Sequence, residues 1–149
     1  MWIRNLGSGL FTALFGLALA GCSKELGRVP FATEATGDTR VQLAPGTVDF
    51  WTDLSVVYLG APSISYQIDL EQSGALVAST ICDPLGPKPI EIGWEEYGKG
   101  PYHRVKGRAR MSCSVVVPKG GPTDVRVTLA YDATAKTVAL TKGDLVVEQ

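Results

Sequence analysis

The sequence has few of the residues that catalytic and metal sites most often use. It contains one histidine, two methionines and three cysteines in 149 residues. With no C-x-x-C pair and no second histidine, a zinc site lacks ligands, and we expect neither a metal nor any other cofactor. No G-x-S-x-G motif is present, and His103 is the only histidine that a catalytic triad has available. The sequence therefore predicts no catalytic residue.

Helical patterns and an excess of charge of one sign are also missing. No segment shows a convincing 3.6-residue period, so no glycine-rich phosphate loop precedes a helix. Lys and Arg number 14 and Asp and Glu number 15. This balance does not favour a nucleic-acid partner. No apolar run reaches the roughly 20 residues that a membrane-spanning helix needs.

The N-terminal segment has the pattern of an export signal. Arg4 precedes fifteen residues without a charge, from Leu6 to Ala20. A positive start followed by a short apolar run is typical of a secretory signal peptide. The run ends in Leu19-Ala20-Gly21-Cys22, where an ordinary cleavage site has small residues at −3 and −1. A plain secreted protein with a chance cysteine, or an uncleaved anchor, is the alternative.

This ending resembles the lipobox of bacterial lipoproteins. The resemblance covers the first 22 residues only, and the later residues resemble no known family. It implies that residues 1–21 are removed and that Cys22 carries the lipid. Two or more acyl chains anchor a protein stably, so the membrane itself is the first expected partner. Ser23 follows the cysteine, where an aspartate retains lipoproteins in the inner membrane, and therefore points to the outer membrane of the bacterial cell envelope.

The mature chain is the size of one domain with one disulfide. Residues 22–149 number 128, and loss of Arg4 leaves 13 basic against 15 acidic residues, a net charge of −2. With Cys22 lipidated, Cys82 and Cys113 remain as an even pair in an exported protein. Such a pair predicts a disulfide, and two buried free thiols are the alternative.

Residues 22–38 mix small, polar and charged side chains without a period. We interpret them as the lipidated N-terminus and a flexible tether with a reach of roughly 20–25 Å. Phe31 is the one residue in it that we expect to pack on the domain. Residues 39–149 then form the domain.

Alternation of apolar and polar residues from position 39 onward predicts half-buried strands. About eight short strands at this spacing indicate an all-β fold, an antiparallel two-sheet β-sandwich of Greek-key, jelly-roll or immunoglobulin-like topology. The expected core faces are Val48, Phe50, Thr52, Leu54, Val56 and Tyr58; Ile64, Tyr66, Ile68 and Leu70; Val105, Gly107, Ala109, Met111, Cys113, Val115 and Val117; and Val125, Val127, Leu129 and Tyr131.

Other segments predict the connections between these strands. Ser73-Gly74 is a hairpin turn, and Ala75–Cys82 is apolar enough for an inner strand. Residues 93–101 form a loop, residues 132–136 a hairpin loop, and Lys142-Gly143 a turn before a last short strand.

Four cations share one face of a strand: Arg104, Lys106, Arg108 and Arg110. Spaced about 6.5–7 Å apart, they form a row that suits phosphates, glycolipid or an acidic polymer. The alternative is a solvated or cross-paired face that protects an edge, with Asp69, Glu71, Glu95 or Glu96 as counter-charges.

Aromatic residues mark the second candidate surface. Trp94, Tyr97 and Tyr102 surround Glu95 and Glu96, a composition that suits a sugar-binding cleft. Adjacent glutamates on an extended chain point in opposite directions, so they match a glycosidase pair poorly. Loop aromatics also commonly seal a core. Trp51 lies on the outward face of its strand, where it either packs under a loop or marks a contact.

These features favour a non-enzymatic envelope lipoprotein, a structural or interaction module whose partner is another envelope protein or a surface glycan. The alternatives are a module that binds carbohydrate or anionic glycolipid and, less favoured, a glycan- or peptide-active enzyme using Glu95, Glu96 or His103.

Overall fold

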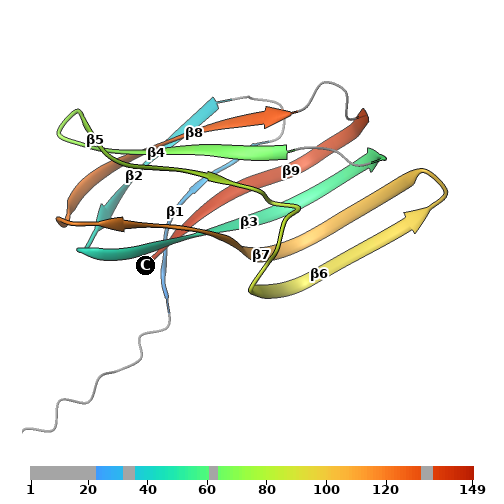
Figure 1. The fold of residues 1–149 in the computed structure, drawn as a ribbon, viewed down its shortest axis with the longest axis horizontal. Coiled ribbons are helices and arrows are strands. Elements are labelled where there is room, and N and C mark those ends of the chain that lie inside the picture. The colour runs from blue at the N-terminus through green and yellow to red at the C-terminus, as the bar shows by residue number, and fades with distance from the viewer. Residues whose placement is uncertain (1–22, 32–35, 61–63, 132–135) are drawn as a thin grey trace, which may run out of the picture.

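The computed structural model describes residues 23–31, 36–60, 64–131 and 136–149. They form two antiparallel sheets packed face to face, which confirms the predicted all-β sandwich (Figure 1). The five-stranded sheet has the order β1-β9-β3-β7-β6, and the four-stranded sheet has the order β2-β8-β4-β5. The signal peptide and Cys22 lie outside the described residues.

Nine strands occur in the described residues, one more than the sequence suggested. Only β4–β5 and β6–β7 are hairpins among them, and the other connections within the domain pass between the sheets. The strands are β1 (Glu25–Val29), β2 (Thr36–Leu43), β3 (Gly46–Leu59), β4 (Ile64–Gln72), β5 (Ala75–Cys82), β6 (Ile90–Lys99), β7 (Tyr102–Val117), β8 (Gly121–Tyr131) and β9 (Lys136–Glu148).

The core lies between the sheets, where period-two alternation placed it. The predicted core-facing residues of β3, β4, β7 and β8 are buried, apart from partial exposure at Tyr58, Gly107 and Cys113. The side chain of Tyr131 lies outside the described side chains. Strand pairing explains this success, because each of these strands has a neighbour on both sides and buries one face.

One polar network is enclosed in this core. The Tyr66 hydroxyl donates to the carbonyl of Gly143 at 2.9 Å and lies 3.2 Å from the hydroxyl of Thr52. Tyr66 is fully buried, so these bonds offset the cost of removing its hydroxyl from water. They also tie β4 of one sheet to β3 and β9 of the other.

The expected tether is wrong in two stretches. Glu25–Val29 is strand β1, which pairs with the end of β9, and residues 36–38 begin β2. Val29 and Phe31 are buried, as expected for Phe31, whose ring centroid lies 6.0 Å from that of Tyr66. β1 is an edge strand with a register shift between Glu25 and Gly27, so its sequence has no clear alternation. A Cβ added at Gly27 would come within 2.5 Å of Val41.

The segment expected to be a loop at residues 93–101 is mostly strand. β6 runs through Lys99, and only residues 100–101 turn into β7. β6 is an edge strand whose residues are almost all exposed, so burial imposes no alternation on its sequence.

The turn predicted at Lys142-Gly143 does not form. β9 continues through Lys142 and Gly143 and pairs with β3 on both sides of a register shift near Ser55. The expected hairpin between β8 and β9 does not form, since these strands belong to different sheets. Residues 132–135 lie outside the described residues.

β5 is an edge strand, not an inner one. Among the described strands it pairs with β4 alone, and Ile81 remains 65% exposed. The Ser73-Gly74 turn between β4 and β5 is confirmed, with φ values of 51° and 78° that suit a tight hairpin.

Cys82 and Cys113 form the predicted disulfide. Their Cα atoms lie 5.5 Å apart, and the bridge joins the end of β5 to β7. It therefore connects the two sheets along the side where β6 extends the larger sheet.

Candidate functional site

The β6–β7 hairpin places two tyrosines and two cations on the outer face of the larger sheet. Tyr97 of β6 lies opposite Arg104 of β7, and Lys99 lies opposite Tyr102. Arg104 in turn lies opposite Val57 of β3. Because alternate residues of a strand share a face, these five side chains stand on one side of the sheet.

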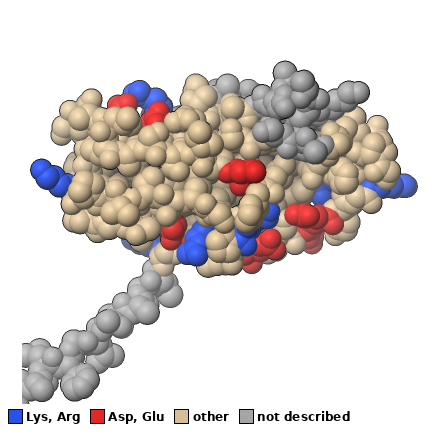
Figure 2. Space-filling model, in the orientation of Figure 1, with Lys and Arg blue, Asp and Glu red and all other residues tan. Residues whose placement is uncertain are grey.

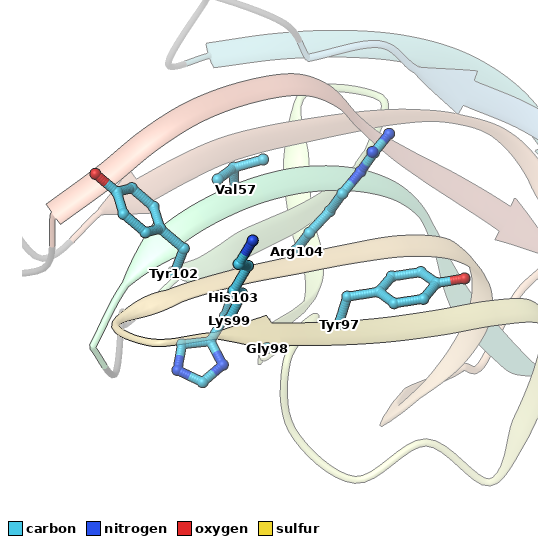
Figure 3. Close-up of a pocket in the computed structure, with 7 residues that line it drawn as sticks. All are labelled: Val57, Tyr97, Gly98, Lys99, Tyr102, His103 and Arg104. Carbon is cyan, nitrogen blue, oxygen red and sulfur yellow. The ribbon is translucent and has the colours of Figure 1, made fainter.

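They surround a hollow of about 400 Å³, here named the hairpin hollow and lined by Val57, Tyr97, Gly98, Lys99, Tyr102, His103 and Arg104. In Figure 3 the tyrosine rings stand at opposite ends, with Val57 and Arg104 between them. Tyr97 and Tyr102 are 61% and 52% exposed, far more than aromatic residues that seal a core. The hollow therefore offers two accessible aromatic faces and an apolar floor.

The cations around the hollow are not neutralised. Within the described ranges, Arg104, Lys99 and Lys106 form no ion pair. Glu95 lies opposite Lys106 in the strand register, but no bond joins them. The hairpin hollow is thus a site of unpaired positive charge beside aromatic rings.

A bulge at Gly107 fixes how β6 approaches β7. The pairing shifts between Ile92 and Glu95, and Gly107 has a φ of 147°. A Cβ at Gly107 would lie 2.6 Å from both the carbonyl oxygen of Gly93 and the Cα of Trp94. Only glycine fits there, so this position sets the register that brings Tyr97 opposite Arg104.

The rest of the predicted basic row is cross-paired. Arg108 binds Glu148 and Glu25, and Arg110 lies 3.5 Å from Asp49. Charges of both signs gather along the lower border of Figure 2, while most of the face turned to the viewer is uncharged. The row therefore divides into a paired half at Arg108 and Arg110 and an unpaired half at Arg104 and Lys106.

Asp69 and Glu71 do not neutralise the basic row, so their prediction as counter-charges is wrong. Asp69 accepts hydrogen bonds from Ser79 and Gln67, and Glu71 pairs with Arg126. Both carboxylates lie on β4, which belongs to the other sheet.

Trp51 is buried although its strand position faces outward. It is 6% exposed, with the guanidinium of Arg108 5.4 Å from the ring centroid. The indole Nε1 of Trp51 and the Nε of Arg108 are the buried side-chain nitrogens without a hydrogen-bond partner among the described residues. Trp51 therefore packs under Arg108, which takes it out of the candidate binding surface.

Beside Trp51, an ionic network fastens β1 to the sheet. Arg28 binds Glu25, Asp53 and Asp144, and Lys142 binds Asp53. The hydrogen bond from Arg28 holds the pKa of the Glu25 carboxyl below its ordinary value. Burial raises the pKa of Asp53, but the hydrogen bonds from Lys142 and Arg28 outweigh it and lower the pKa overall.

Trp94 and Glu96 lie apart from the hairpin hollow. The Trp94 indole donates to Glu96 at 2.7 Å and packs against the core, with the Lys88 ammonium 4.6 Å from its ring centroid. Burial and the charge of Glu96 raise the pKa of Tyr58, on which His103 stacks. The side chains of Trp94 and Glu96 therefore belong to the inner face of the hairpin.

The two glutamates do not converge. Glu95 is paired in register with Lys106, whereas Glu96 is held by Trp94 on the opposite face. Their arrangement does not bring two carboxylates onto one substrate.

The described part of the chain holds no cluster of three or more His, Cys, Asp or Glu residues suited to a metal. It also has no helix long and apolar enough to cross a membrane.

Sequence reasoning found Tyr97, Tyr102 and Arg104 but missed Val57 and Lys99, which complete the hairpin hollow. Val57 comes from a strand some 40 residues earlier in the chain and is placed there by the β3–β7 register. The signal available in the sequence for Lys99 was its position between Tyr97 and Tyr102. No family model and no curated protein matches this chain.

Proposed function

We propose that this chain is a non-catalytic, lipid-anchored module of the bacterial cell envelope, and that the hairpin hollow binds an acidic glycan. The hollow carries the proposal, because Tyr97 and Tyr102 flank the unpaired cation Arg104. Aromatic faces accept sugar rings, and a guanidinium binds carboxylates or phosphates in a planar, two-bond geometry.

The proposed location of the protein in the cell envelope rests on its N-terminal sequence. The lipobox-like Leu19-Ala20-Gly21-Cys22 supplies the anchor, and the disulfide between Cys82 and Cys113 suits an oxidising compartment. Ser23 supports the outer membrane as the destination.

The anchor is tested by the intact mass of protein extracted from bacterial membranes. We expect the mass of residues 22–149 plus acyl chains, with Cys82 and Cys113 alkylated only after reduction. A Cys22→Ala variant should leave the membrane fraction. An unlipidated mass for the unchanged protein would contradict the anchor.

The ligand class is tested with a matched pair of probes, an oligogalacturonate and its methyl ester. They share the sugar ring and differ in charge. The acid should bind, more weakly as salt increases, and the ester should bind less. Arg104→Ala, Tyr97→Ala and Tyr102→Ala should each weaken binding, whereas Arg40→Ala, in the smaller sheet, should not. Equal affinity for acid and ester would remove the acidic glycan as the ligand.

A protein partner on β6 is the second candidate. No other described strand pairs with the outer edge of β6, and Ile90 and Ile92 are exposed beside it. A partner strand could therefore contact both backbone groups and apolar side chains. Crosslinking in intact envelopes should capture one protein in a fixed ratio, and Ile92→Lys should abolish the capture. Ile81→Lys on edge strand β5 is the control and should not.

A further inference from the structure

Contacts with β9 are present from Ser23 onward, the residue that follows the lipobox cysteine. The Ser23 hydroxyl donates to the carboxylate of Glu148 at 2.8 Å. Lys24 and Gln149 exchange both backbone hydrogen bonds, at 3.1 and 3.2 Å. The β1–β9 pairing is therefore extended to Lys24, one residue after the serine that itself contacts β9.

This leaves no room for a tether. Consecutive Cα atoms are about 3.8 Å apart, so Cys22 lies one residue's length from Ser23. At the start of the stretch that the sequence predicts to be a flexible spacer, Ser23 and Lys24 contact β9, and Glu25–Val29 pair with it. If Cys22 carries the lipid, as the proposed function requires, its acyl chains hold the folded domain itself against the headgroups.

We propose that one end of the sandwich rests on the lipid headgroups. This end, the terminal surface, consists of Ser23, Lys24, Ala44, Pro45, Lys119 and Gln149. The occupant is the membrane that holds the acyl chains of Cys22, and this inference rests on the proposed lipidation.

Contacts between neighbouring residues make the terminal surface continuous. The Gln149 side chain donates to the carbonyl of Ala44 and accepts from its N–H, both at 2.7 Å. Gly120 lies so close to Leu43 and Pro45 that an added Cβ would be 3.0 and 3.1 Å from their atoms. The chain entry, the C-terminus and the two loops after β2 and β7 thus form one connected surface.

The charge of the terminal surface suits phospholipid headgroups. The loops 44–45, 73–74 and 118–120 at this end contain no Asp or Glu. Glu148, which contacts Ser23, is paired with Arg108. Lys24 and Lys119 are exposed and, within the described residues, form no ion pair. Lysines near an anionic lipid surface are attracted to it, so the anchor and the charge favour the same orientation.

This orientation presents the hairpin hollow on the side away from the membrane. Figure 1 shows the β6–β7 turn at the end of the long axis opposite the start of β3 and the end of β7. Tyr97, Tyr102 and Arg104 line that distal end. A ligand would therefore reach the hollow without crossing the headgroup layer.

The test compares lysine labelling within one protein. The lipidated chain is bound to the outside of preformed phosphatidylethanolamine–phosphatidylglycerol vesicles and treated with a membrane-impermeant amine reagent. Labelling of Lys24 and Lys119 is read by peptide mass spectrometry relative to Lys99, which is exposed at the β6–β7 turn. We expect both ratios to be several-fold lower than in a control that stands off the membrane.

That control is a variant with a Ser-led Gly/Ser linker of about 15 residues inserted between Cys22 and Ser23, which adds a reach of roughly 20 Å. The fold, the anchor and the residue type after Cys22 stay the same. Equal ratios in the two acylated proteins would overturn the orientation while leaving the anchor intact. Absence of acyl chains from both would overturn the anchor, and the orientation with it.

Discussion

The guanidinium of Arg108 covers the indole of Trp51, with Cζ 5.4 Å from the ring centroid, and the same guanidinium binds Glu148. Two long-range pairings produce this arrangement. β7 brings Arg108 beside β3, and β9 carries the carboxylate on the other side of β3. A tryptophan on an outward strand position thereby becomes part of a buried layer, and an arginine in a basic row becomes structural.

Replacing Arg108 with alanine should destabilise the domain by about 2 kcal/mol. The variant uncovers Trp51 and leaves the nearly buried Glu148 without its closest cation. Arg104→Ala is the matched control, because Arg104 faces the same side of β7 without an ion pair among the described residues. It should change stability by no more than about 0.5 kcal/mol. Urea unfolding measures both, and equal losses would show that the Arg108 contacts contribute nothing.

The Arg28 network should make the domain less stable in acid. Glu25 and Asp53 have pKa values below their ordinary values of 4.5 and 3.8 in the folded state. The unfolded chain therefore binds more protons as the pH falls, so stability is lost below about pH 4.5 and down through the folded-state pKa values. Unfolding free energies measured from pH 7 to pH 2 should show this slope.

Arg28→Ala should flatten that slope, because it removes a partner of both carboxylates, and it should cost about 1 kcal/mol at neutral pH. Arg40→Ala removes an exposed ion pair with Asp124 in the other sheet. This variant should keep the same dependence of unfolding free energy on pH as the unchanged protein. If both variants lose stability in acid as steeply as the unchanged protein, groups outside the Arg28 network control its acid stability.

Much of the fold was predictable because inner strands carry a strict pattern. β3, β4, β7 and β8 each have two neighbours, so a shift by one residue would expose their apolar faces. The edge strands β1 and β6 carry no such constraint. Their sequences therefore resembled a tether and a loop, although each is held by a full antiparallel partner.

The candidate site was predictable only in part. Tyr97, Tyr102 and Arg104 are close together in the sequence, and the hairpin brings them onto one face. Whether each cation of the basic row forms an ion pair depends on which strands lie beside β7 and β3. The alternation of apolar and polar residues does not reveal this strand order. The ion pairs of Arg108 with Glu148 and of Arg110 with Asp49 could therefore be found only from the structure.

Removing the disulfide should cost roughly 3–4 kcal/mol, because it closes a loop across a sequence separation of 31 residues. The measurement is urea unfolding of the unchanged protein and of a Cys82→Ala, Cys113→Ala double variant, each with and without reductant. Reductant should lower the stability of the unchanged protein and leave that of the variant unaltered. Equal stability of oxidised protein and variant would contradict a stabilising bridge.

Gly107→Ala should destabilise the domain and weaken binding at the hairpin hollow, because its Cβ would collide with the backbone of Gly93 and Trp94. Gly121→Ala is a close control: its φ is 146°, against 147° at Gly107, but no atom lies within 4 Å of an added Cβ. Both variants share the backbone strain, so the difference between them, about 1–3 kcal/mol, measures the collision. Urea unfolding measures the loss of stability, and oligogalacturonate binding measures the loss of affinity at the hairpin hollow. Equal losses at the two glycines would mean that β6 adjusts freely and that the bulge does not set the register of Tyr97 and Arg104.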